Sequence, residues 1–527
     1  MLQDRTPSVR DLSATDREIA MRYVSTRDET RSTKSFKEVL LAGLAPRGGL
    51  YVPETYPQLN LAALRGKSYA EVASLVMDLF VDPSDQFTPL IGNTYTKKIF
   101  GTEAIAPVTQ ICPEVYKLEV SNGPTASFKD MSLQYLGPLM EYVLAKKGEK
   151  RNIVLATSGD TGSAAGEALK SRKGLALFVL FPKKGMSEFQ RRQMTTLNEP
   201  NIFPIEVNGN FDALQDVVKQ INNDQAFKEK NHISALNSIN WARVMAQVVY
   251  YFWACLQVTK KDTDEVVFSV PSGNFGDALA AYVAMRMGAP IRRIIIATNE
   301  NDVLVECFTK GICRKREKEV NTSSPSMDIN IPSNYERYVF DFVGRNSAVI
   351  RDLWKQLDTK GSFSLGALLM RPDPEGYFSR IVAGSAHQHE VLRCIQKTYC
   401  HHDVLIDPHT AVGLYVGMRY RIQGLPLVVV ETALPVKFGD TIYEAIGKTP
   451  DIPSRYERLG ELPDHRQGVV YLDRGGRPGA GFDGHCALCR SVQRSGCHRY
   501  DDFGDGRHLS LYVRHHGSFA GDHRTVD

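Results

Sequence analysis

The sequence predicts an α/β protein built on parallel β-sheets that helices cover on both faces. Between residues 152 and 299, short β-branched runs alternate with longer stretches of helical periodicity. This succession favours parallel strands, whose ligands gather where the strands end. With 527 residues, the chain is also long enough for more than one hydrophobic core.

The apolar runs set the expected elements. We expect buried strands at 153–155, 177–180, 266–268, 294–296 and 425–430, and helices at 212–221 and 241–256. The strand runs carry no charge, which is typical of strands buried on both faces of a sheet.

Composition divides the chain into four parts. We expect a disordered extension at 1–20 and a mainly helical domain at 21–110. Residues 111–467 hold the predicted strands, and within them the charged, irregular stretch 310–404 predicts a partly helical surface region. Residues 468–527 contain no lysine and no apolar periodicity, which indicates a disordered tail or a wrongly assigned reading frame.

Charge and targeting signals narrow the class of protein. A formal net charge of +4 gives no reason to expect a nucleic-acid or membrane partner. The apolar run 244–258 is shorter than the roughly 20 residues that span a bilayer. The first twenty residues lack the apolar core of a secretory signal and contain acids that a mitochondrial transit peptide avoids. We therefore expect a cytoplasmic protein.

The cysteines predict no metal site. Six of them are scattered, which is typical of reduced thiols inside cells: Cys112, Cys255, Cys307, Cys313, Cys394 and Cys400. Cys486, Cys489 and Cys497, with the neighbouring His485 and His498, lack the spacing of a zinc site.

The first turn that carries chemistry runs from Ser121 to Asp130 and presents Lys129 at the start of a predicted helix. A lysine amine condenses with an aldehyde only when it is unprotonated, and partial burial against Phe128 favours that form. A lysine at a helix start is more often a solvated side chain, so this turn alone leaves both interpretations open.

Two further turns follow predicted strands. The hydroxyls and amides of 157–162 suit an anion, although Ser158 or Asp160 could instead cap the helix. In the turn 271–277, Gly273 and Gly276 allow the backbone to approach an oxyanion closely. Similar turns also close strand-helix units in many unrelated folds.

Together, the three turns resemble those of the fold-type II pyridoxal-phosphate enzymes, and within them the threonine synthase family. GPTASFKD is similar to that family's lysine motif, TSGDTGSAA to its substrate loop and PSGNFGD to its cofactor-phosphate loop. Further matches lie at 237–243, 297–302 and 407–413, and the resemblance runs from residue 21 to 467. It implies two parallel-sheet α/β domains with the cofactor between them, plus a mainly helical N-terminal domain.

The resemblance also implies residue roles. Lys129 would carry pyridoxal 5'-phosphate as a Schiff base, and the Thr432 hydroxyl would face the pyridine nitrogen. The rest of the cofactor site would comprise Gly273, Asn274, Phe275 and Asp277, and the substrate side would comprise Ser158, Asp160, Thr161, Asn240 and Arg243. The chain departs from the family pattern at Asn122 and Leu434, where the family usually has histidine.

The implied reaction converts O-phospho-L-homoserine and water to L-threonine and phosphate, in a monomer or homodimer. Two alternatives stay open. One is a threonine synthase-like phospho-lyase or dehydratase that releases a keto acid, and the other is an inactive cofactor-binding protein on the same fold.

Overall fold

The computed structural model describes residues 21–85, 87–209, 211–316, 318–366, 373–466 and 469–471. The predicted extension at 1–20 lies outside these residues. So do the cysteine–histidine pattern at 485–498 and all of the predicted tail except 469–471.

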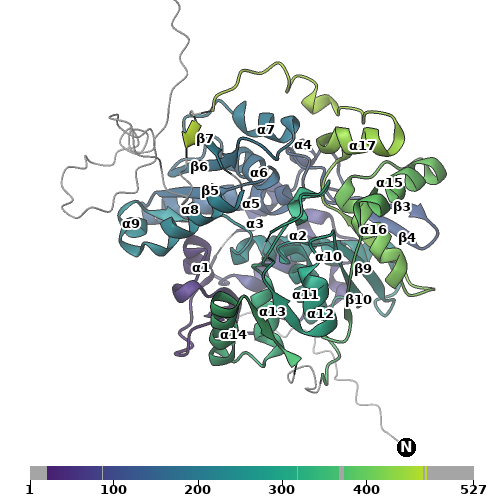
Figure 1. The fold of residues 1–527 in the computed structure, drawn as a ribbon. Helices are drawn as coiled ribbons and strands as arrows, with labels where there is room; N and C mark the ends of the chain where they lie inside the picture. Colours follow the sequence, from purple (N-terminus) through teal and green to yellow (C-terminus); the bar gives the residue numbers. More distant parts are fainter. Residues whose placement is uncertain are drawn as a thin grey trace, which may run out of the picture.

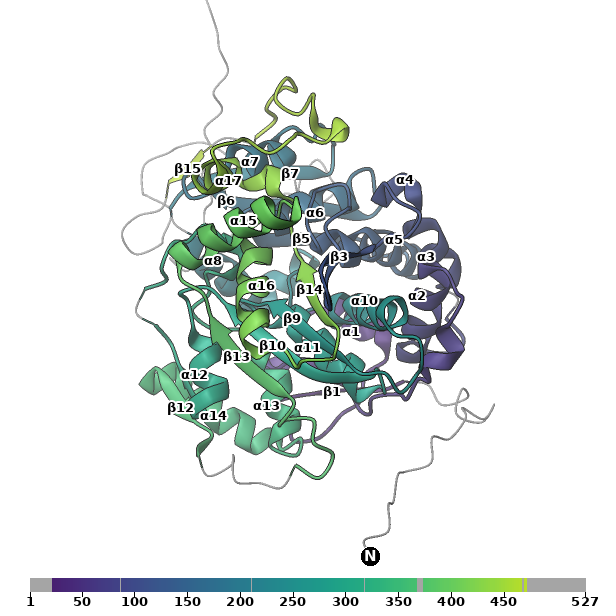
Figure 2. The ribbon, with the colours of Figure 1, turned by 90° about the vertical axis from the view of Figure 1, so that its right-hand side faces the viewer.

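Two separate sheets form the frame of the molecule (Figures 1 and 2). The larger has the order β13 (Ile381–Ser385), β10 (Ile291–Thr298), β9 (Val266–Pro271), β14 (Leu427–Glu431), β4 (Val115–Glu119) and β3 (Val108–Cys112). Its strands are parallel except β3, which pairs antiparallel with β4. The predicted strands at 266–268, 294–296 and 425–430 are confirmed as β9, β10 and β14.

The second sheet is parallel throughout. Its order is β15 (Val469–Tyr471), β7 (Ile202–Asn208), β6 (Leu175–Pro182), β5 (Arg151–Ala156) and β8 (Ile233–Ser234). The predicted strands at 153–155 and 177–180 are confirmed as β5 and β6. Strand β15 belongs to the stretch predicted as a tail, so three residues of that stretch join the sheet.

Helices surround both sheets. Around the second sheet and the space between the two lie α5 (Lys129–Lys147), α6 (Asp160–Leu169), α7 (Glu188–Thr195), α8 (Phe211–Asn223) and α9 (Gln225–Lys230). Around the larger sheet lie α10 (Trp241–Val258), α11 (Gly276–Arg286), α12 (Val303–Lys310), α15 (Gln388–His402), α16 (Pro408–Tyr420) and α17 (Gly439–Ile446). The predicted helices at 212–221 and 241–256 are confirmed as α8 and α10.

Helix α10 explains the long apolar run in the sequence. Every residue from Trp241 to Cys255 is buried, so this helix is apolar because other elements cover it on all sides. Within the described part of the chain, no helix has both the length and the apolarity needed to cross a membrane.

The N-terminal region packs on this core through short helices and a two-stranded antiparallel sheet. It contains β1 (Tyr23–Ser25), α1 (Phe36–Ala42), β2 (Tyr51–Pro53), α2 (Tyr69–Met77), α3 (Thr88–Thr94) and α4 (Lys97–Phe100). Ser35 and Ser68 begin α1 and α2 with capping boxes that use Glu38 and Glu71. The boundary predicted at residue 110 falls inside β3.

Two expectations need correction. The stretch 310–404 lies partly at the surface, but it also supplies β13 to the larger sheet and the fully buried Arg337. Its other elements are β11 (Ile312–Arg314), α13 (Tyr335–Phe342), α14 (Ser347–Lys360) and β12 (Ser362–Ser364). Cys307 and Cys313, expected as free thiols, form a disulfide between α12 and β11.

Candidate active site

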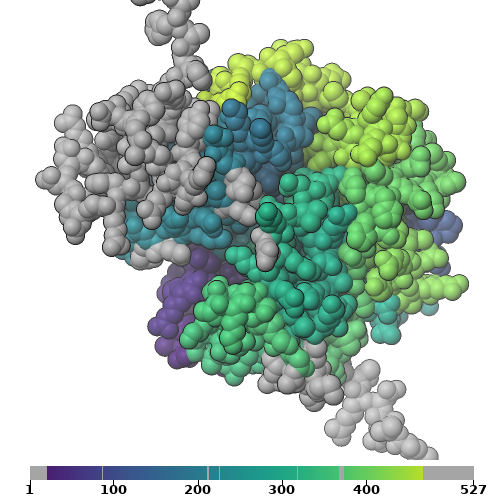
Figure 3. Space-filling view, in the orientation of Figure 1, coloured from purple at the N-terminus to yellow at the C-terminus, as the bar shows by residue number. Residues whose placement is uncertain are grey.

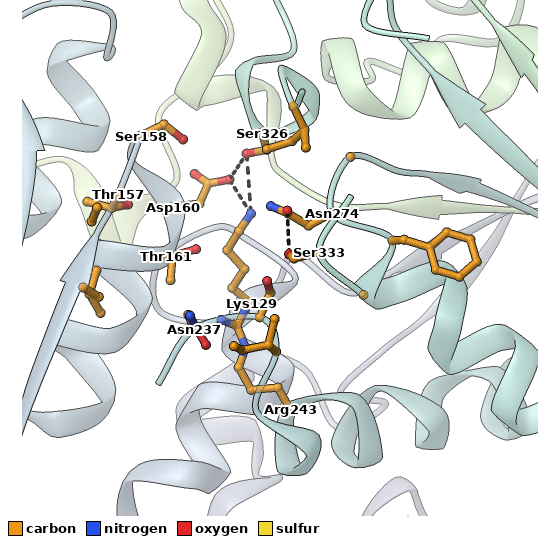
Figure 4. Close-up of a pocket in the computed structure, with 18 of the residues that line it drawn as sticks. Lys129, Thr157, Ser158, Asp160, Thr161, Asn237, Arg243, Asn274, Ser326 and Ser333 are labelled. Carbon is orange, nitrogen blue, oxygen red and sulfur yellow. Dashed lines mark hydrogen bonds and ion pairs between the residues drawn. The ribbon is translucent and has the colours of Figure 1, made fainter. Parts of the chain in front are cut away.

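A cavity of about 390 Å³ lies where strands of both sheets end. Its walls come from the turn after β5, the turn after β9, the start of α5 and the segment after β14. Figure 4 shows the Lys129 side chain extending between these walls toward Asp160 and Ser326. The volume and the mixture of apolar walls with a few polar groups suit a small organic ligand.

The cavity brings together every predicted site residue except Asn240. Its lining includes Lys129, Ser158, Asp160, Thr161, Arg243, Gly273, Asn274, Phe275, Asp277 and Thr432. Asn240 is instead fully buried at the start of α10, where its side chain caps the helix and donates to the carbonyl of Leu40. The structure thus gives Asn240 a structural role outside the cavity.

The backbone around Lys129 is fixed to the larger sheet. The Phe128 amide donates to the Thr432 carbonyl at 2.9 Å, and the Leu434 amide donates to the Ala126 carbonyl at 3.2 Å. These bonds join the start of α5 to the segment that leaves β14, so Lys129 and Thr432 reach the same cavity.

The Lys129 amine is nearly enclosed by protein. Its Nζ lies 4.5 Å from the centre of the Phe128 ring and 3.0 Å from Asp160 Oδ2. Burial lowers the pKa of this amine, although the Asp160 carboxylate acts in the opposite direction. The expected burial against Phe128 is confirmed, and it favours the unprotonated, reactive form.

Asp160 is the most densely bonded group at the cavity. Its Oδ2 accepts from Lys129 and from the Ser326 hydroxyl, both at 3.0 Å. Its Oδ1 accepts from Gln190 Nε2 at 2.9 Å and pairs with Lys437 Nζ at 2.6 Å. Burial alone would raise the pKa of this carboxyl, but the two lysines hold it well below its usual value.

The start of α6 presents polar groups to the cavity. The Thr157 hydroxyl accepts from the Gly159 and Gly162 amides at 3.0 Å each, whereas neither Ser158 nor Asp160 caps the helix. The capping alternative is therefore wrong, and the Ser158 and Thr161 side chains remain at the cavity wall beside the positive end of α6.

The turn after β9 ends in the left-handed residue Phe275, which begins α11. The Phe275 ring packs against Phe308, Tyr335 and Tyr338, so its backbone is the part that lines the cavity. A Cβ atom at Gly273 would lie 2.9 Å from the Met327 Cα atom, so only glycine fits. The first-turn amides of α11 lack partners within the helix and suit a phosphate.

Unpaired polar atoms provide a test of what the cavity can hold. The side chains of Ser272, Asn237, Arg243 and Asp277 each have a buried polar atom with no hydrogen-bond partner among the described residues. Buried polar atoms are normally paired, so atoms like these around one cavity indicate a polar ligand. A lysine, two helix starts and these groups together fit a phosphorylated aldehyde cofactor beside a second anion.

The sequence did not predict several residues that lie at the site. Ser326 and Ser333 come from the irregular stretch 310–404, which gave no signal. His409 and Lys437 lie within or beside motifs that matched the family, yet the sequence gave neither a role. In the structure, the His409 ring accepts from the Ser326 amide at 3.3 Å, and Ser333 donates to Asn274 at 2.9 Å.

The two departures from the family pattern lie away from the cavity. Neither Asn122 nor Leu434 belongs to the described cavity lining. The Asn122 carbonyl accepts from Arg455 at 2.9 Å, and Leu434 supports the lysine turn through its backbone amide. Neither departure therefore changes a side chain of the described cavity lining.

Comparison with known proteins identifies the class that this fold and site define. Residues 97–358 match the family described as "Pyridoxal-phosphate dependent enzyme". Residues 22–95 match "Threonine synthase N terminus", and residues 410–472 match "Threonine synthase, C-terminal". The protein is a pyridoxal-phosphate-dependent enzyme of fold type II.

The chain belongs to the threonine synthase family. It is 46% identical over 462 residues to a threonine synthase of Methylobacillus glycogenes, covering 84% of this chain and 96% of the relative. It is also 46% identical over 455 residues to that of Corynebacterium glutamicum, covering 84% and 94%.

A solved structure agrees with this assignment. The pyridoxal-phosphate-bound threonine synthase of Brucella melitensis superposes with a TM-score of 0.80 at 41% identity, covering 86% of this chain and 97% of that one. The family and fold class expected from the sequence are confirmed.

Proposed function

We propose that the protein converts O-phospho-L-homoserine and water to L-threonine and phosphate, with Lys129 as the residue that binds the cofactor and moves protons. The observation that carries this proposal is the buried Lys129 amine in a cavity between the starts of α6 and α11. Family membership supplies the substrate class, and the unpaired donors Arg243 Nε and Ser272 Oγ agree with anionic ligands.

Pyridoxal phosphate would be held by groups on three sides. The amides of Gly273, Asn274 and Phe275 are assigned to its phosphate, together with the Ser272 hydroxyl. Thr432 is assigned to its ring nitrogen and Lys129 to its aldehyde carbon. Once bound, the cofactor ring takes up electron density from the carbon that bears the substrate amine.

The substrate side uses the opposite wall. Ser158 and Thr161, at the positive end of α6, are assigned to the substrate carboxylate. Arg243 is assigned to the substrate phosphate because the Nε atom of its buried guanidinium has no hydrogen-bond partner among the described residues. Burial lowers the pKa of Arg243 to about 10, so the group still carries its charge at neutral pH.

Lys129 would act as general base and then as general acid. Asp160 and Ser326 fix the position of its amine from one side, at 3.0 and 3.5 Å. A lysine with a lowered pKa can remove a proton from the substrate carbon that bears the amine. Later in the reaction, it can deliver a proton to another carbon of the substrate. The enclosing walls keep these transfers away from bulk water.

The test is to incubate the cofactor-loaded protein with O-phospho-L-homoserine and to measure phosphate and amino-acid products. We expect threonine and phosphate in equal amounts from the wild type and none from Lys129→Ala. Lys146→Ala, at the exposed end of the same helix, is the matched control and should keep activity. Phosphate with a keto acid would assign the protein to the phospho-lyases. No phosphate from a folded, loaded protein would refute the proposal.

We also propose that the enzyme acts in the cytoplasm as a monomer or homodimer. The proposed reaction acts on a small molecule and needs no macromolecular partner. Sedimentation of the loaded protein tests the oligomeric state, and a fluorescent fusion tests the location.

A further inference from the structure

Lys437 is a completely buried lysine that does not line the cavity. It lies in the short 3₁₀ helix η7 (Pro435–Phe438), which follows Thr432 and β14. Its ammonium group pairs with Asp160 Oδ1 at 2.6 Å and donates to the Thr125 carbonyl at 2.9 Å. A buried charge is costly, so this cation needs both acceptors.

Asp160 therefore lies between two lysines. Lys129 contacts one carboxylate oxygen from the cavity side, and Lys437 contacts the other from behind. When all three groups are ionised, Asp160 is shared between two positive charges. Arg243 adds a further positive charge near Lys129, and the buried carboxyls of Asp277 and Asp130 act on Lys129 and Lys437 respectively. The two lysines repel each other across the one carboxylate that they share, which favours loss of a proton from one of them.

The two lysines differ in how well their ammonium forms are satisfied. Lys437 has two fixed oxygen acceptors at 2.6 and 2.9 Å. Lys129 has the Asp160 carboxylate at 3.0 Å, but its other oxygen neighbour, Ser326 Oγ, is 3.5 Å away and itself donates to Asp160. The proton is thus lost more easily from Lys129, which is the lysine that faces the cavity.

We propose that Lys437 is a positioning residue for the reaction, acting through Asp160. Its charge balances the carboxylate whenever Lys129 is neutral, and it prevents Asp160 from holding Lys129 permanently as an ammonium. It also links the carboxylate at the start of α6 to the Thr125 carbonyl of the lysine turn. The lowering of the Lys129 pKa by the nearby Lys437 charge, which adds to the larger effect of burial, agrees with this role.

The proposal rests on the proposed role of Lys129, and its test needs no substrate. The rate at which the apoprotein takes up pyridoxal phosphate depends on neutral Lys129, so its pH profile reports the protonation of that amine. In Lys437→Met, we expect the midpoint of this profile to move up by about one pH unit, so that uptake below it is about tenfold slower. The separate variant Lys437→Arg keeps the positive charge, so its midpoint should equal that of the wild type.

Two further variants separate charge from structure. Gln190→Leu removes the neutral donor to the same Asp160 oxygen, at 2.9 Å, and should leave the midpoint unchanged. Lys437→Gln keeps a donor without the charge, so it should shift like Lys437→Met and serves if that variant does not fold. A wild-type midpoint in folded Lys437→Met or Lys437→Gln would overturn the proposal, because Lys437 would then be structural only. A wrong substrate assignment would leave all these midpoints unaffected.

Discussion

Asp277 illustrates how burial sets the chemistry of one side chain at this site. The Tyr250 and Tyr251 hydroxyls both donate to its Oδ1 atom. Burial nevertheless dominates and raises the pKa of Asp277 to about 6, from a usual value of 3.8. The sequence motif indicated a cofactor residue here, but it gave no sign of the two tyrosines that hold the carboxyl.

This shift predicts a pH-dependent stability. Because the pKa of Asp277 is raised in the folded state, its contribution to the free energy of unfolding is fully present below pH 3.8. This contribution is lost as the pH rises from 3.8 through 6. Asp277→Asn should therefore gain up to about 3 kcal/mol of unfolding free energy relative to wild type over that range. Urea unfolding of both apoproteins between pH 4 and 7 measures this difference. Burial also raises the pKa of Asp130 to about 6. Asp130 is present in both proteins, so its contribution cancels in the difference between their unfolding free energies. A pH-independent difference would contradict the assignment.

At the scale of the elements, the turn after β9 depends on close backbone packing. Gly273 approaches the loop that carries Ser326 and Met327, where an added Cβ would meet backbone atoms at 2.9 Å. Gly276 is three residues along the same turn, but the nearest atom to its added Cβ is the side-chain Nδ2 of Asn334 at 3.4 Å.

Gly273→Ala should therefore displace the turn and weaken cofactor binding at least about tenfold, which corresponds to about 1.4 kcal/mol. Gly92→Ala, in α3 and outside the described cavity lining, is the control because an added Cβ there meets no atom within 4 Å, and it should bind the cofactor as the wild type does. Absorbance titration of the two apoproteins with pyridoxal phosphate gives both affinities. Equal affinities would show that the loop near Met327 can yield, and that the turn does not need its glycine.

The strands and turns of the site could be predicted from the sequence because their signals are local. Apolar β-branched runs mark β5, β9 and β14, and a Gly-containing or hydroxyl-rich turn follows each of the first two. The assignment of these strands to two different sheets could not be predicted, because alternation along the chain does not specify which strands pair.

The loop at 324–333 could not be predicted for a different reason. Its position depends on a buried network in which Asn299 and Asn301 donate to Asp328 at 2.7 and 3.0 Å. These partners are more than twenty residues apart, and the contact leaves no periodic pattern in the sequence. The loop nevertheless delivers Ser326 to Asp160.

At the scale of the whole molecule, the C-terminal segment closes over the lysine turn. Figure 3 shows this segment in yellow on the surface beside the blue residues of α7. Arg455 donates to the carbonyls of Asn122 and Gly123 at 2.9 and 3.0 Å, and Arg192 on α7 donates to the Leu459 carbonyl at 2.9 Å. Contacts remote in sequence therefore support the turn that presents Lys129.

Truncation tests this arrangement. A chain ending at Tyr471 keeps every described residue of the cavity and of both sheets, so it should bind the cofactor and turn over substrate as the full chain does. A chain ending at Ile446 loses the Arg455 contacts and should retain the cofactor poorly and melt at a lower temperature. Differential scanning calorimetry and cofactor absorbance compare the three proteins. If the chain ending at Tyr471 failed to fold, residues beyond 471 would be needed for the folded protein.

The central claim is that Lys129, and not the neighbouring Lys437, binds the cofactor. Both amines contact Asp160, but only Lys129 faces the cavity. The most direct measurement is borohydride reduction of the loaded protein, followed by mass spectrometry of its peptides. The account predicts a phosphopyridoxyl group on the peptide that contains Lys129 and on no other. A label on Lys437, or on any lysine outside the cavity, would contradict it.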